Sequence, residues 1–223
     1  MGRFALLIAW ALAALPFSLA PAAAADLTLP FTDEAAQDAT FLAYRDRLTA
    51  AVAARDAGAV ADMADSEILM SFGGDGGRDT FRSWLTDGPW GGAEPAEDFW
   101  RELETVLALG GRFDGPEMFS APYYWSAELP ESLDPYATHI VMADGTPVLS
   151  APAADAKVLA RLPVGAVVET VADDWDQPFH RIRRADGGEG YMAAADLRSL
   201  IDYRAIFERG KGGWRMTIFV AGD

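Results

Sequence analysis

The chain has 223 residues, of which 34 are acidic and 18 are basic, and its formal net charge at pH 7 is −16. This balance argues against nucleic acid as a partner, because phosphate contacts need clustered Lys and Arg, and it equally disfavours docking on an anionic membrane. The absence of cysteine excludes a thiol nucleophile, a lipid-modified cysteine and disulfide stabilisation.

Residues 1–25 have the pattern of a cleavable signal peptide. Arg3 supplies a positive charge, residues 4–15 form a short apolar run, and three alanines at 23–25 make a cleavage motif before Asp26. The apolar run is too short for the roughly 20 residues that span a bilayer. We therefore expect export to a bacterial periplasm, with no membrane attachment once the leader is removed.

The region up to about residue 85 has the periodicity of helices with one short strand. The first helix is indicated by apolar side chains three and four residues apart, namely Phe41, Tyr44, Leu48 and Val52. A second helix is expected over Ala59–Met63, and a buried strand over Ile68–Phe72. Glycine-rich residues 73–77 then form a loop, and Asp79 is expected to cap a helix over residues 80–85.

The next helix is expected over Phe99–Leu109, where apolar residues again share one face, and Gly110 is expected to end it in a left-handed conformation. The aromatic run Met118–Trp125 is expected to be extended. Ser126–Pro135 contains two prolines and has the composition of a linker.

From Thr146 to Ser199, short β-branched runs alternate with Gly, Pro and Asp turns, which is typical of a small barrel built from strands. Asp186-Gly187 is a turn signal between the last two strands. Ala194–Ser199 is expected to close the barrel with a short helical turn. The expected strands cover residues 147–149, 158–161, 167–171, 180–183 and 190–193.

Two alternating runs, Tyr203–Glu208 and Trp214–Val220, flank a glycine-rich turn and predict a hairpin with one apolar face. In the second run, the apolar face is expected to carry Trp214, Met216, Ile218 and Val220. A lone hairpin is marginally stable in water, so this one must pack on another element. Two placements are open. The hairpin packs on the barrel, or the chain returns and the hairpin joins the sheet of the N-terminal region.

The predicted fold class is α+β. After the signal peptide at residues 1–25, we expect an N-terminal α+β domain at 26–128, a small all-β barrel at 138–199 and the C-terminal hairpin at 200–223.

The barrel segment resembles the bacterial SH3-like domain family. The matching residues are Pro147-Val148, Ser150-Ala151-Pro152, Val158-Leu159, Leu162, Gly165, Val167, Trp175, Ile182, Asp186-Gly187, Gly190-Tyr191-Met192 and Leu197. The family's usual Trp is Tyr191 here, and residues 176–179 lengthen the turn after Trp175. The resemblance implies a module that binds cell-wall peptide or glycan, or a protein partner, with Trp175, Phe179 and Tyr191 as the contact patch. Alternatively, Trp175 and Tyr191 fill the barrel core.

The remainder is similar to the nuclear transport factor 2-like α+β cone. The similarity rests on a long first helix, a short second helix, a strand, another helix and a terminal hairpin of the type F-x-x-x-x-G-x-W at Phe207 to Trp214. On this interpretation, the barrel is inserted before the last two strands. A pocket lined by Phe41, Phe72, Trp100 and Tyr124 would then hold a small apolar molecule.

The sequence lacks the catalytic or metal-binding residues of several enzyme classes. Only His139 and His180 could supply imidazole, they flank the barrel without sharing a pocket, and no H-E-x-x-H or G-x-S-x-G motif is present. Glu97, Glu102 and Glu104 could in principle pair as glycosidase carboxylates, but a solvated helix face explains them better.

We therefore expect a non-enzymatic binding protein without a cofactor or metal. Three kinds of ligand stay open: a cell-wall component on the barrel, a small molecule or substrate in an N-terminal pocket, and a basic partner on the acidic surface.

Overall fold

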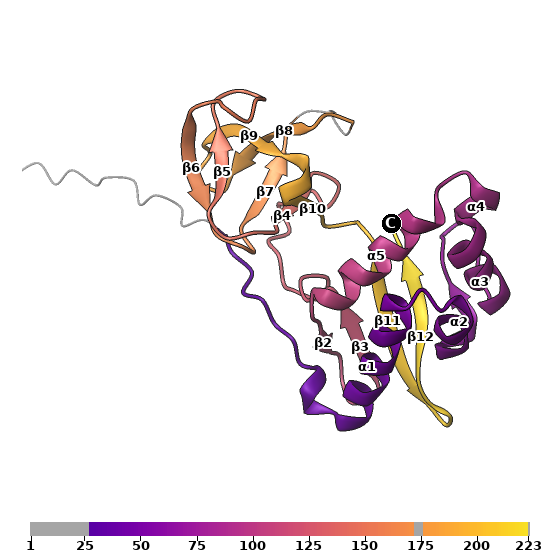
Figure 1. Cartoon of the computed structure of the whole chain (residues 1–223). Helices are drawn as coiled ribbons and strands as arrows, with labels where there is room; N and C mark the ends of the chain where they lie inside the picture. The colour runs from indigo at the N-terminus through magenta and orange to yellow at the C-terminus, as the bar shows by residue number, and fades with distance from the viewer. Residues whose placement is uncertain (1–26, 172–175, 223) are drawn as a thin grey trace, which may run out of the picture.

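The computed structural model describes residues 27–171 and 176–222, in which the chain forms a mixed α+β fold with two sheets. The predicted α+β class is confirmed. Figure 1 shows the two sheets as separate units, each with helices or loops of its own.

Helices come first along the chain. They are η1 (Ala35–Gln37), α1 (Ala39–Ala53), α2 (Ala57–Met63), α3 (Arg78–Asp87), α4 (Pro89–Gly92) and α5 (Ala96–Ala108), with strand β1 (Ala64–Leu69) between α2 and α3. The expected helix faces are confirmed, because Phe41, Tyr44, Leu48 and Val52 are all buried, as are Phe99, Leu103, Val106 and Leu107. Gly110 has the expected positive φ of 65° after α5.

Two local predictions are wrong. The first strand begins and ends earlier than expected, so Phe72 lies beyond it and is 58% exposed. The residue that precedes α3 is Gly77, with φ 86°, and Asp79 lies inside the first turn without a capping hydrogen bond. The chain needs a positive φ where it turns from the loop into the helix. Glycine adopts this conformation readily, whereas residues with a side chain do not.

The five-stranded sheet combines segments from both ends of the chain. Its order is β1-β12-β11-β3-β2, with β2 (Arg112–Phe113), β3 (Met118–Ala121), β11 (Arg204–Gly210) and β12 (Gly213–Val220). β12 runs parallel to β1, while β11 is antiparallel to both β12 and β3. The terminal hairpin therefore lies in the middle of the N-terminal sheet, which is the second of the two placements left open by the sequence.

A β-bulge in this hairpin changes which side chains reach the core. The register shifts between Ile206 and Phe207, so that Thr217 is the extra residue. Phe219 is consequently fully buried, whereas Ile218 is only half-buried. The strict alternation predicted for this strand is therefore wrong at Ile218 and Phe219, because the inserted residue changes the face to which each side chain points.

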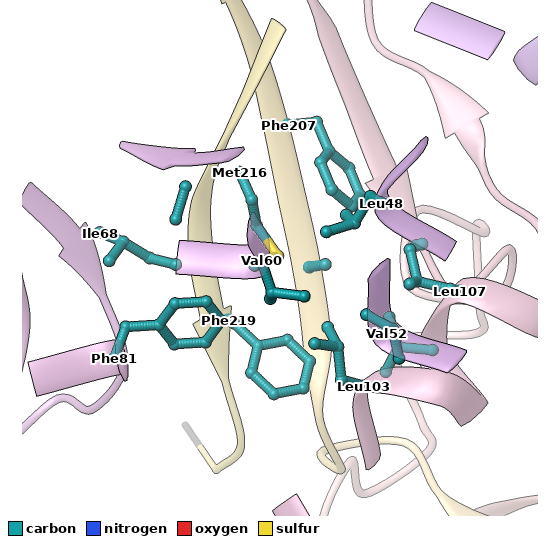
Figure 2. Packing of buried hydrophobic residues seen from close by; sticks show 14 of the residues in the cluster. Leu48, Val52, Val60, Ile68, Phe81, Leu103, Leu107, Phe207, Met216 and Phe219 are labelled. Carbon is teal, nitrogen blue, oxygen red and sulfur yellow. The ribbon is translucent and has the colours of Figure 1, made fainter. Parts of the chain in front are cut away.

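The main core lies between this sheet and its helices. Figure 2 shows Phe81 and Phe219 facing each other, with Phe207 close to Leu48, so sheet and helix residues interdigitate. Phe41 has no exposed surface, and its ring lies 4.2–6.2 Å from those of five other aromatic residues, namely Tyr44, Phe113, Phe119, Phe207 and Trp214. The interior of this unit is filled by side chains.

The second sheet has the order β10-β4-β7-β8-β9-β5-β6. Its strands are β4 (Thr138–Val141), β5 (Thr146–Leu149), β6 (Val158–Leu162), β7 (Val167–Thr170), β8 (Phe179–Arg184), β9 (Glu189–Ala193) and β10 (Leu197–Ser199), with η2 (Ala194–Asp196) before β10. All five expected strands are present, and β4 and β10 join them. The described strands form an open sheet with β10 and β6 at its ends, so the predicted closed SH3-like barrel is not shown.

The two units meet around a third apolar cluster built on Leu29, Tyr123, Tyr124, Ile140 and Val167. The chain crosses between the units at residues 29–33, where Leu29 bonds to Gly165 and Glu34 to Gly111 through their backbones. Buried Arg198 on β10 adds an ion pair of 2.8 Å to Glu102 on α5. This contact joins the seven-stranded sheet to helix α5 of the other unit.

We predict that Phe41→Ala lowers the free energy of unfolding by about 3–5 kcal/mol, because it removes a fully buried ring and leaves a cavity. The matched control Phe72→Ala removes the same side chain from an exposed position and should cost less than about 1 kcal/mol. Chemical denaturation of both variants measures the difference. Equal losses would contradict the packing described above.

Candidate binding groove

The structure separates the residues of the predicted barrel patch. Trp175 lies outside the described residues. Phe179 begins β8 and Tyr191 lies on β9, and their pairing with Ala193 and Arg181 places both on the same outward face of the sheet. Both are half-buried, and neighbouring Met192 occupies the core instead of Tyr191.

His139 and His180 are closer together than the sequence indicated. Both are buried, and their ring centroids lie 6.1 Å apart on β4 and β8. Sequence reasoning did not anticipate this proximity, which arises because the fold brings these strands to either side of β7. Across residues 27–171 and 176–222, however, no three His, Asp or Glu side chains gather into a group that could hold a metal ion.

The helical carboxylates are held in ion pairs with arginines. Glu97 and Glu104 bind opposite sides of Arg55, at 2.7 and 2.5 Å, while Glu102 pairs with Arg198. The hydrogen bond from Arg55 lowers the pKa of Glu97 below its usual value. A general acid needs the opposite shift, so this set does not resemble a glycosidase pair.

The pocket expected in the N-terminal unit is not formed by its predicted residues. Phe41, Trp100 and Tyr124 are buried among other side chains, whereas Phe72 is exposed beside Arg204. These three residues therefore belong to the packed core and do not line the predicted pocket.

The surface of the five-stranded unit has a groove of about 700 Å³ between helix α1 and the end of the β11–β12 hairpin. We call this the α1–hairpin groove; its lining residues are Ala39, Thr40, Ala43, Tyr44, Arg47, Met63, Arg209, Gly212, Gly213, Trp214 and Arg215. Its volume lies within the usual range of about 300–1,000 Å³ for small-molecule sites. In Figure 1, the hairpin turn beside it lies at the end of the unit far from the seven-stranded sheet.

The groove is basic in a strongly acidic protein. Three of its lining residues are arginines and none of those described is acidic, and Lys211 lies in the adjacent turn. Arg209 pairs with Asp38 at 2.9 Å, and Arg215 donates to the carbonyl of Asp62. No ion pair with a described residue involves Arg47, Lys211 or Arg215, although Glu208 is the cross-strand partner of Arg215.

Asp38 fixes the position of the hairpin against the helix. It is the N-cap of α1, where its carboxylate accepts from the backbone amides of Thr40 and Phe41 at 2.7 and 3.0 Å. The same carboxylate accepts from Arg209, while the indole of Trp214 donates to the Thr40 hydroxyl at 3.1 Å. One acidic residue thus joins two segments that are far apart in the sequence.

Sequence reasoning missed this groove. Ala39, Ala43 and Arg47 are spaced by four residues and share one face of α1, and basic residues alternate around the hairpin turn. Neither signal is specific by itself. Their meaning depends on the contact between helix and hairpin.

Comparisons with known proteins give no family assignment. No protein-family model and no curated protein matches the chain. One similar solved structure is an NTF2-like protein with a cystatin-like fold from Novosphingobium aromaticivorans, with 14% identity, coverage of 82% of this chain and 88% of that one, and a TM-score of 0.26.

Another is assigned as a calcium/calmodulin-dependent protein kinase II association domain from Xanthomonas campestris. It has 12% identity, coverage of 87% of this chain and 97% of that one, and a TM-score of 0.27. TM-scores this low carry no argument about fold or function. The resemblance of residues 146–199 to the SH3-like family gains no support from the comparisons.

The helices within residues 27–171 and 176–222 are all too short or too polar to cross a membrane.

We predict that the carboxyl group of Asp38 titrates below its ordinary value near 3.9, because the Thr40 hydroxyl and the α1 amides favour its charged form. A lowered pKa in the folded state means that its stabilisation is present above the unfolded pKa and is lost as pH falls through the folded pKa. Carbon-detected NMR titration measures the shift directly.

The Asp38→Asn variant keeps a good N-cap residue but cannot be ionised. Its denaturation midpoint should therefore fall less than that of the parent between pH 5 and pH 3. Asp46→Asn, an exposed change on the same helix, should leave the parent's pH dependence unaltered. Identical pH dependence in the parent and Asp38→Asn would contradict the role given to Asp38.

Proposed function

We propose that this chain is an exported, non-catalytic binding protein, and that its ligand site is the α1–hairpin groove, which takes an anionic ligand. The observation that carries the proposal is the contrast in charge. The chain as a whole is strongly acidic, yet this groove is lined by Arg47, Arg209 and Arg215 without an acidic residue among those described.

Physical reasons favour binding here over the other surfaces. Guanidinium groups form charge-assisted hydrogen bonds with carboxylates and phosphates, which are about twice as strong as neutral ones. The surrounding acidic surface repels anions, so an anionic ligand is attracted only where the arginines of the groove lie. This proposal replaces an internal cone pocket with a surface groove on the same α+β unit.

We predict that citrate binds the protein at low ionic strength and that Arg47→Gln weakens its binding about three- to tenfold. The loss follows from removing one charge-assisted contact at a partly hydrated site. Isothermal titration calorimetry measures both dissociation constants. Added salt should weaken binding to the parent, because partly exposed charges are screened.

Arg161→Gln is the matched control, since Arg161 is exposed on β6 of the other sheet and its loss changes the net charge equally. It should leave citrate binding within twofold of the parent. Equal weakening by both substitutions would mean that citrate senses only net charge, and the groove would lose its assignment.

A second candidate function belongs to the seven-stranded unit. Phe179 and Tyr191 share an outward face of β8 and β9, as a cell-wall contact patch of an SH3-like module would require. Such a module would act in the periplasm, to which the leader at residues 1–25 would direct the chain.

For this second candidate, we predict that protein recovered from the periplasm begins at Asp26 and is retained by isolated cell wall. Tyr191→Ala should reduce retention severalfold, whereas Arg47→Gln should not, because aromatic stacking and groove charge are separate properties. A pull-down with quantified protein tests this. Retention that is absent, or unaffected by Tyr191→Ala, would remove this function.

A further inference from the structure

The lining of the α1–hairpin groove has an apolar part and a charged part. The apolar part of its lining, here called the floor, consists of Ala39, Ala43, Met63 and the rings of Tyr44 and Trp214. The charged part consists of Arg47, Arg209 and Arg215. Gly212 and Gly213 border it, and a side chain built at either position would meet no atom within 4 Å. The groove is therefore open at the turn and apolar beneath.

Polar atoms of the floor already have partners within the protein. The phenol of Tyr44 donates to the carbonyl of Met63 at 2.9 Å, and the indole of Trp214 donates to Thr40 at 3.1 Å. Burial raises the pKa of Tyr44, so its phenol stays neutral and remains a donor. A ligand over this floor consequently meets carbon surface and gains little from further hydrogen bonding there.

The charge available to a ligand comes from Arg47 and Arg215. Both line the groove together with Tyr44, and their positive charges offset only part of the rise in its pKa that burial causes. Arg47 is exposed on α1, and Arg215 is half-buried and held by the carbonyl of Asp62. One guanidinium is thus free to reorient, and the other is fixed beside the floor.

A small inorganic anion would leave most of this groove unused. The volume of about 700 Å³ is many times the roughly 30 Å³ occupied by a water molecule. An apolar surface beside arginine side chains matches a ligand that carries an apolar chain and a negative charge in one molecule.

From these observations we infer that the ligand of the α1–hairpin groove is an amphiphilic carboxylate, with its apolar chain over Ala43 and Met63 and its carboxylate on Arg47 and Arg215. This inference rests on the proposed anion-binding function and specifies the class of ligand.

The test uses straight-chain carboxylates, namely butyrate, hexanoate, octanoate and decanoate, each below its critical micelle concentration. Every methylene that leaves water adds to the affinity, so binding should tighten about two- to fourfold per added methylene. Tightening should stop when the floor is covered. Isothermal titration calorimetry and the fluorescence of the full chain measure it.

Ala43→Phe fills the floor without changing any charge. It should abolish the dependence on chain length, so that decanoate binds no more tightly than butyrate in this variant. Ala50→Phe is the matched control, because Ala50 is exposed on the same helix outside the groove. It should behave as the parent does, which also shows that α1 tolerates an added ring.

The outcomes separate the inference from the function beneath it. Equal affinity for butyrate and decanoate, with citrate binding still weakened in Arg47→Gln, would overturn the amphiphilic ligand and leave the anion site standing. Tighter binding of a glutamate-rich peptide than of decanoate would overturn it in favour of a protein partner. If neither citrate nor any carboxylate binds, both proposals fail.

Discussion

The position of the β11–β12 hairpin between β1 and β3 is the constraint on which the five-stranded unit depends. Without it, β1 would have no neighbour in the sheet, and β2 and β3 would form an isolated pair. Two-stranded pairs are marginally stable in water, and the helices need an apolar sheet surface to cover. The hairpin supplies that surface through Phe207, Met216 and Phe219, which are all fully buried.

The same hairpin creates the groove, because successive residues of a strand point to opposite faces. Trp214 and Met216 point toward α1 and its core, while Arg215 between them remains at the surface and reaches α2. Beyond the sheet, Arg209 reaches the N-cap of α1. Fold stability and ligand recognition therefore share residues, and damage to the hairpin would affect both. The seven-stranded unit is held by a different set of contacts, chiefly the apolar cluster at the junction and Arg198.

Helices and strands could be predicted from the sequence where a single periodic pattern of apolar residues determines them. The faces of α1 and α5 and the existence of the hairpin follow from residues close together in the chain. The bulge at Thr217 could not be predicted, because an inserted residue leaves no separate trace in an alternating pattern. The groove could not be predicted either, since Thr40 and Trp214 are 174 residues apart and meet only in the folded chain. The histidine pair was missed for the same reason, as β4 and β8 are neighbours only through β7.

The most direct measurement is a set of NMR distance contacts between decanoate and the methyl groups of the protein. If the helix and hairpin form the binding site, the alkyl protons of decanoate will show nuclear Overhauser effects to the methyls of Ala39, Ala43 and Met63. Contacts to Val158 and Leu159 on the exposed edge of the other sheet, with none to α1, would contradict the assignment.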